Sequence, residues 1–268
     1  MTDAGQLMSK IKATLVFFAC GMMFLHASNA SEDTVELSPR VGETIKIRLT
    51  ATDRPVASVI LFPGGDGNIG ITRWGIDKES NFLVRSRDMF ADNGLMVAVV
   101  DAPSDKEGGA GMLYGFRTST EHVTDIDAVI EHLQKRANIP VWLIGTSRGT
   151  ESAAHIAIHT GKKIGGIVLT ASVTERNKKG TAVTKMELDK IRVPVLIASH
   201  KKDGCRVTPA SGAKKIKSKL KNAPVVEIKY YTGGKPPLSK PCKAESEHGF
   251  FGIEEEVVKD IALFVKSH

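Results

Sequence analysis

The sequence contains little cysteine and few large aromatic residues: 3 of its 268 residues are cysteine, 2 are tryptophan and 3 are tyrosine. It has no internal repeat, no low-complexity tract and no long linker, which favours a single domain. Beyond residue 30, no apolar run is long enough to cross a membrane as a helix, which requires roughly 20 residues. The rest of the composition, 41% hydrophobic and 25% charged, is that of an ordinary globular protein.

The first 30 residues have the pattern of a secretory signal peptide. Lys10 and Lys12 precede an apolar run at 13–25, and small residues follow up to Ala30. The apolar run is too short for a typical transmembrane anchor. We therefore expect residues 1–30 to be removed, leaving a domain at 31–268 that is exported to the periplasm or secreted, without stable membrane insertion.

Cleavage after Ala30 leaves two of the three cysteines, Cys205 and Cys242. In an exported chain, two cysteines are most simply explained by one disulfide. A metal site built from two cysteines so far apart in sequence is much less favoured. No other group of residues predicts a metal or a cofactor.

The formal net charge of +7 raises the question of nucleic-acid binding. The densest basic stretch consists of Lys214, Lys215, Lys217, Lys219 and Lys221. Ile216 and Leu220 lie between these lysines at helical spacing, as on the solvated face of an amphipathic helix. No aromatic side chains alternate with the lysines to stack on bases. We therefore expect no nucleic-acid partner.

Short apolar runs alternate with helical patterns along the chain. Strands are predicted at 44–49, 57–62, 95–100, 141–144, 164–169, 193–199 and 225–231, and helices at 82–93, 118–137, 150–161, from Thr208 onward and at 253–265. The strand at 44–49 alternates apolar and polar residues, which is typical of an edge. The others are almost continuously apolar. This rhythm predicts an α/β fold with a mostly parallel sheet covered by helices on both faces.

One pentapeptide, Gly145-Thr146-Ser147-Arg148-Gly149, follows the strand at 141–144 and leads into a helix. In a strand-to-helix turn of the Gly-X-Ser-X-Gly type, the serine is held in a strained conformation with its side chain exposed at the tip. A serine placed there is a candidate nucleophile. The motif is short and also occurs by chance in ordinary loops. Whether Ser147 is a nucleophile therefore depends on partner residues elsewhere in the chain.

Reactive residues of parallel sheets gather at the carboxyl ends of the strands. Asp203 follows the strand at 193–199, and His248 lies between the last strand and the last helix. A histidine can take the serine proton near neutral pH, and a carboxylate can orient the histidine. Glu175 and Asp101 also follow strands and remain alternatives for the acid. His200 lies close to a strand end, whereas the remaining candidates, His122, His132, His155 and His159, fall on predicted helices.

Over residues 40–268 the chain resembles the α/β-hydrolase superfamily, on the basis of the serine pentapeptide, Asp203 and His248. The resemblance implies Ser147 as nucleophile, His248 as general acid and base, and Asp203 as the acid that orients it. It also implies an oxyanion hole from the backbone N–H of Arg148 and that of Gly65 or Asp66. The segment at 171–192 is short and polar, so we expect no large cap domain.

The resulting expectation is a serine hydrolase that cleaves a small ester-type substrate through an acyl-enzyme. An amide, a thioester or a lactone is an alternative bond. A non-catalytic binding protein on the same fold is the alternative from another class, because fold does not determine function. If Cys205 and Cys242 pair, the disulfide joins the loop of Asp203 to the loop of His248. The sequence does not indicate the acyl group, the leaving group or the oligomeric state.

Overall fold

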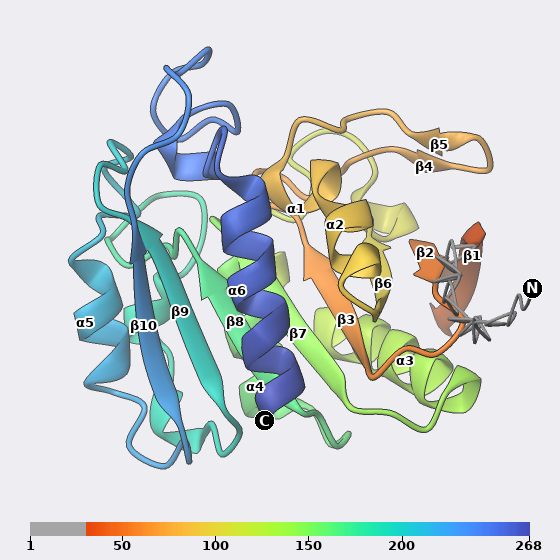
Figure 1. Cartoon of the computed structure of the whole chain (residues 1–268). Coiled ribbons are helices and arrows are strands. Elements are labelled where there is room, and N and C mark those ends of the chain that lie inside the picture. The colour runs from red at the N-terminus through yellow and green to blue at the C-terminus, as the bar shows by residue number, and fades with distance from the viewer. Residues whose placement is uncertain (1–30) are drawn as a thin grey trace, which may run out of the picture.

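An eight-stranded sheet runs through the centre of the computed structural model, which describes residues 31–268 (Figure 1). The predicted signal peptide at 1–30 lies outside the described residues. The strands of this sheet are β1 (Ser31–Arg40), β2 (Glu43–Ala51), β3 (Ala57–Phe62), β6 (Leu95–Val100), β7 (Val141–Thr146), β8 (Gly166–Thr170), β9 (Val195–His200) and β10 (Val226–Tyr231). None of the helices in this region has the length and apolar character needed to cross a membrane.

The strands are arranged in the order β1-β2-β6-β3-β7-β8-β9-β10. The six strands from β6 to β10 pair in parallel, whereas β1 and β2 form an antiparallel extension of the sheet. The prediction that the strand at 44–49 forms the edge is wrong, because β1 covers it, with Val35 opposite Ile47. The sequence of β1 is mostly polar because an edge strand buries only part of one face, and for that reason no strand is predicted there from the sequence.

Helices cover both faces of the sheet, as predicted. They are α1 (Phe82–Arg85), α2 (Arg87–Asp92), α3 (Thr120–Arg136), α4 (Gly149–His159), α5 (Gly212–Lys217) and α6 (Glu254–Ser267). Alternate residues of β3 face opposite layers: Ile60 and Phe62 belong to a hydrophobic cluster that includes side chains of α3, α4 and α5, whereas Val59 and Leu61 belong to one that includes side chains of α1, α2 and α6. This two-sided burial explains why the central strands are almost continuously apolar.

Three local predictions differ from the structure. The helix expected at 82–93 is divided into α1 and α2 at Ser86, whose hydroxyl donates to the Phe82 carbonyl. The helix expected from Thr208 begins only at Gly212, since the Thr208 hydroxyl binds other side chains instead of capping the helix. The apolar residues of the helix predicted at 253–265 also lead us to expect Leu263 to face inward, whereas in α6 it is 49% exposed.

The connections at the carboxyl ends of the strands lie together at the top of Figure 1. One of them carries a short hairpin of β4 (Ile71–Thr72) and β5 (Gly75–Ile76), whose base is fixed by Asp101: its carboxylate accepts from the N–H groups of Ile69 and Ile71. Between β8 and β9 the chain forms only two short 3₁₀ turns. A large cap domain is therefore absent from this connection, as predicted.

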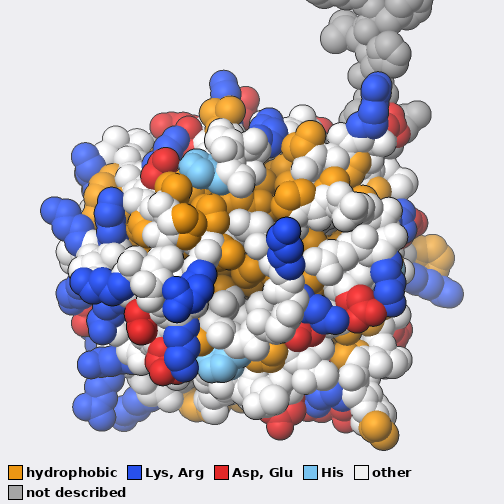
Figure 2. All heavy atoms as spheres, turned by 90° about the horizontal axis from the view of Figure 1, so that it is seen from below, with side chains coloured by type: hydrophobic (Ala, Val, Ile, Leu, Met, Phe, Trp, Pro, Cys, Tyr) orange, Lys and Arg blue, Asp and Glu red, His pale blue; other side chains and the backbone are white. Residues whose placement is uncertain are grey.

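The basic residues of α5 lie on its solvent side, where Lys215 pairs with Glu175 of the connection after β8. Lys214, Lys215 and Lys217 are exposed on this helix, whereas Ile216 is fully buried beneath it. Figure 2 views the molecule from the end opposite the connections, and Lys and Arg side chains gather there on the side that carries α5. The lysine-rich stretch is thus the solvated face of an amphipathic helix, as its periodicity predicted.

Candidate active site

Ser147 occupies the turn between β7 and α4. Its φ is +52°, in the left-handed region that a residue with a side chain seldom adopts. The turn is this sharp because its two glycines have no Cβ: one at Gly145 would strike the Gly149 carbonyl, and one at Gly149 would strike the Phe62 carbonyl. The Ser147 N–H donates to the Thr170 carbonyl at 3.0 Å, which fixes the strained residue against β8.

Asp203 and His248 contact each other, although 45 residues separate them in sequence. The Nδ1 of His248 lies 3.0 Å from Oδ2 of Asp203. Oδ1 of Asp203 accepts from the N–H of Cys205 at 2.9 Å, so both carboxylate oxygens have partners. Because Nδ1 donates to the carboxylate, the neutral imidazole carries its free lone pair on Nε2.

Thr208 contacts both members of this pair. Its hydroxyl donates to Oδ2 of Asp203 at 2.9 Å and also lies 3.1 Å from Nδ1 of His248. Thr208 is 1% exposed, so its contacts are shielded from water. Sequence reasoning missed this residue because a Thr-Pro pair before a helical pattern predicts an N-cap. The sequence feature that could have identified Thr208 is its short separation from Asp203.

A disulfide joins Cys205 to Cys242 and so connects the Asp203 loop to the His248 loop. On the His248 side, the loop is also held by Ser246: its hydroxyl donates to the Lys243 carbonyl and accepts from the His248 N–H. The disulfide and this pair of hydrogen bonds fix the backbone on either side of Lys243 and next to His248.

The alternative acids have other partners. Asp101 accepts from three backbone N–H groups, including that of Ala102, and is 1% exposed, which makes it a structural anchor. Glu175 pairs with Lys215 at 2.7 Å. Neither carboxylate contacts His248, so among the alternatives considered only Asp203 is placed to orient it.

The alternative histidines either have other contacts or lie outside the pocket. His200 bonds the Gly233 carbonyl through Nε2 and accepts from the Lys202 N–H at Nδ1. His122 is buried in α3 between Phe62 and Phe116, and burial holds its pKa well below the usual 6.5. Burial also lowers the pKa of His155, to about 4, and that of His132. None of the histidines in α3 and α4 lines the pocket described below.

The loop after β3 supplies Gly64 and Gly65 next to Ser147. A Cβ at Gly64 would lie 3.0 Å from the Ser147 Cβ, so glycine permits this close approach. Arg117 lies beneath the loop, 1% exposed, and donates to the Pro63 carbonyl at 2.9 Å and to the Ser152 hydroxyl at 2.8 Å. Burial lowers its pKa to about 10. Arg117 falls in an irregular glycine-rich stretch, where no sequence pattern identified it.

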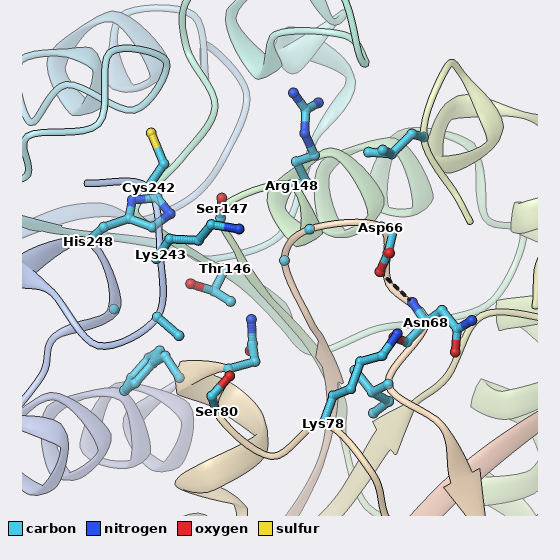
Figure 3. Close-up of a pocket in the computed structure, with 18 of the residues that line it drawn as sticks. Asp66, Asn68, Lys78, Ser80, Thr146, Ser147, Arg148, Cys242, Lys243 and His248 are labelled. Atoms are coloured by element: carbon cyan, nitrogen blue, oxygen red, sulfur yellow. Dashed lines mark hydrogen bonds between the residues drawn. The ribbon is translucent and has the colours of Figure 1, made fainter. Parts of the chain in front are cut away.

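The backbone N–H groups expected to form an oxyanion hole border the same space. Gly65, Asp66 and Arg148 all line one pocket with Ser147 and His248 (Figure 3). Within residues 31–268, no hydrogen bond engages the backbone N–H of Gly65 or of Arg148. Two donors directed at a substrate oxygen are what a tetrahedral intermediate requires.

This pocket has a volume of about 450 Å³ and lies at the carboxyl ends of the strands. Phe82 and Leu113 are among its few large apolar lining residues. Three lysines, Lys78, Lys179 and Lys243, also belong to the lining. In the described part of the chain no hydrogen bond joins Ser147 to His248, and such contacts commonly close only when substrate binds.

One group of side chains has the composition of a metal site. Ligand atoms of Asp203, Cys205 and His248 lie within 4.8 Å of one another. The Cys205 sulfur is bonded to Cys242 and is therefore not a thiolate, the form that binds metals. The remaining two groups bind each other, so this cluster does not fit a metal ion.

No protein-family model and no curated protein matches the sequence significantly. The fold, in contrast, is similar to many solved structures. A protein from Thermoplasma acidophilum, described as a predicted CIB-like hydrolase, aligns at a TM-score of 0.59 and 16% identity, covering 89% of this chain and all of that one. An esterase from Pyrococcus furiosus aligns at 0.63 and 14%, covering 89% and 91%. A cold-adapted esterase from an Arctic intertidal metagenomic library aligns at 0.61 and 13%, covering 87% and 94%. The chain therefore has the α/β-hydrolase fold.

Proposed function

We propose that the protein is a serine hydrolase that cleaves a small carboxylic ester through an acyl-enzyme. One observation carries the proposal: the strained Ser147 lines a pocket together with His248, whose Nδ1 is bound to Asp203. The esterases and hydrolases that share the fold support the reaction class. Because the sequence identity to these proteins is low, the bond type and the residue roles are inferred from the geometry of the site alone.

In this mechanism Nε2 of His248 takes the proton of Ser147 as its oxygen attacks the substrate carbonyl. The resulting oxyanion is bound by the N–H groups of Arg148 and of Gly65 or Asp66. His248 then gives the proton to the leaving alkoxide, and the alcohol departs. A water molecule, deprotonated by the same nitrogen, attacks the acyl-enzyme, and Nε2 then returns the proton to the Ser147 oxygen as the acid departs. Asp203 stabilises the imidazolium in both steps.

We further propose that the chain is exported. The signal-peptide pattern at 1–30 and the disulfide between Cys205 and Cys242 support an oxidising compartment such as the periplasm or the medium. The substrate would then be a small molecule encountered outside the cytosol.

The proposal is tested with Ser147→Ala and, as a matched control, Ser267→Ala at the exposed end of α6. We expect a fluorophosphonate probe to label the unaltered protein and the control but not Ser147→Ala. Turnover of 4-nitrophenyl esters should fall by at least about 10³-fold in Ser147→Ala alone. Equal labelling of both variants would contradict the proposal. Absence of labelling in all three proteins would instead favour a binding protein on this fold.

A further inference from the structure

We propose that the pocket takes an ester-type substrate that carries an anionic group, such as a carboxylate, and that lysines at the pocket rim bind this group. The inference rests on the proposed hydrolase function for the bond that is cleaved. It adds the chemical class of the substrate. The charges of the lining residues and the way these lysines are held carry the argument.

Positive charge dominates the lining. Lys78, Lys179 and Lys243 belong to it, and Asp66 is its one carboxylate among the residues described. None of the three lysines forms an ion pair within residues 31–268. Three ammonium groups around one concave space create a positive potential, since like charges reinforce each other where low-dielectric walls limit screening.

Arg148 also lines the pocket, but its charge is used elsewhere. Its guanidinium donates to Oε1 of Glu151 at 2.9 Å and to Oδ1 of Asn177 at 2.8 Å. In Figure 3 the side chain extends away from the pocket. Arg148 therefore contributes its backbone to the pocket and its side chain to the loop that follows β8.

That loop carries Lys179, and Arg148 holds it in place. Oδ1 of Asn177, which binds Arg148, also accepts from the N–H of Lys179 at 3.0 Å. The Lys179 carbonyl accepts from the N–H of Tyr114 at 2.9 Å. Both backbone groups of Lys179 are thus fixed, which holds this residue in the lining of the pocket.

Lys243 is held with similar rigidity. It directly follows Cys242 of the disulfide, its N–H donates to the Lys240 carbonyl, and its carbonyl accepts from the Ser246 hydroxyl. Figure 3 shows its side chain directed toward Ser147. The disulfide therefore also helps to hold Lys243 in the lining of the pocket that contains Ser147.

Lys78, the third cation of the lining, and Asp66, its one carboxylate, leave the net charge of the lining positive. Lys78 donates one hydrogen to the Asn68 carbonyl at 2.8 Å, which leaves two for a ligand. Oδ1 of Asp66 accepts from the N–H of Asn68 in a local turn. A neutral apolar substrate gains nothing from this arrangement, because the lining offers it few apolar side chains. An anionic substrate gains both attraction to the pocket and direct partners in it.

The test compares two 4-nitrophenyl esters that differ by one methyl group: the adipate half-ester, which is an anion, and its neutral methyl ester. A second pair, 4-acetoxybenzoate and its methyl ester, places the charge on the leaving group. We expect a higher kcat/KM for the anion in at least one pair, with a preference that falls as salt is added. Lys243→Gln should reduce this preference about threefold, and Lys179→Gln combined with it about tenfold.

Lys217→Gln, on α5 outside the pocket lining, removes the same charge and should leave the preference unchanged. If both pairs show equal kcat/KM, or if Lys217→Gln and Lys243→Gln act alike, the inference is wrong.

A binding measurement separates this inference from the proposed reaction. The Ser147→Ala protein, which should not turn the esters over, is titrated calorimetrically with the half-ester and the methyl ester. Tighter binding of the anion, lost when Lys243→Gln is added, supports the inference even if no variant hydrolyses the esters. Hydrolysis of both esters at equal rates, together with equal binding, overturns the anionic substrate class while leaving the hydrolase proposal intact.

Discussion

The Thr208 hydroxyl lies against both the Asp203 carboxylate and the His248 ring. It has one hydrogen, and the carboxylate is the better acceptor because it is charged. Donation to Oδ2 leaves the oxygen lone pairs free to share the His248 Nδ1–H. A single buried hydroxyl thereby limits the rotation of both side chains, and we assign Thr208 as a positioning residue of the proposed reaction.

Thr208→Val removes the hydroxyl at almost constant volume. We expect kcat to fall about tenfold with KM nearly unchanged, because a hydrogen bond to a charged group contributes about 1.5 kcal/mol. Steady-state kinetics with a 4-nitrophenyl ester measures both constants. Thr208→Ser keeps the hydroxyl and should restore most of the activity. Equal loss in the serine variant would indicate that packing of the Thr208 methyl group is what matters.

At the scale of elements, two irregular connections carry the residues that contact each other. One follows β9 and holds Asp203, and the other precedes α6 and holds His248. Neither connection has a helix or strand of its own at the contact, apart from a 3₁₀ turn at Glu247–Gly249. Their relative position depends on the disulfide between Cys205 and Cys242 and on the side-chain hydrogen bonds around it.

Replacement of both cysteines by serine should lower the free energy of unfolding by roughly 3–4 kcal/mol, because the bond closes a loop of 37 residues in the unfolded chain. Urea denaturation of the oxidised protein and of the double variant measures the difference. At urea concentrations where both are folded, we also expect lower activity in the variant, because the two connections are then joined only by hydrogen bonds. Equal activity and equal stability would show that the bond has neither effect.

At the scale of the whole molecule, a buried histidine should make stability depend on pH. His122 is fully buried in α3, neither ring nitrogen has a hydrogen-bond partner in residues 31–268, and its pKa lies well below 6.5. The folded protein therefore keeps this ring neutral at pH values where the unfolded chain binds a proton. Its contribution to stability is complete above pH 6.5 and is lost as the pH falls further.

His122→Phe should remove this dependence. Below pH 6.5 the loss for one proton is about 1.4 kcal/mol per pH unit, so the unfolding free energy of the variant should decline less steeply by that amount. Urea denaturation at a series of pH values between 4 and 8 provides both curves. His155, whose pKa of about 4 also reflects burial, is retained and accounts for part of the remaining slope. Parallel curves for the two proteins would contradict the assignment.

The sequence by itself determined the layered fold and the position of the turn that carries Ser147. Both depend on short-range patterns: β3, β6 and β7 are apolar throughout because the sheet is covered on both faces, and Gly145 and Gly149 allow a turn that other residues obstruct. Order along the chain also placed Asp203 and His248 at the same edge of the sheet. The prediction was weakest where local composition misleads, as in the polar edge strand β1 and at Thr208.

Only the tertiary structure decided which of these residues meet. It paired His248 with Asp203 instead of Asp101 or Glu175, and it brought Lys179 and Lys243, which are more than 60 residues apart in sequence, to one pocket. The physical reason is that such contacts form between irregular loops, whose paths depend on long-range hydrogen bonds and a disulfide. No periodicity in the sequence records those interactions, whereas the strands and helices that support the loops follow from their own pattern of burial.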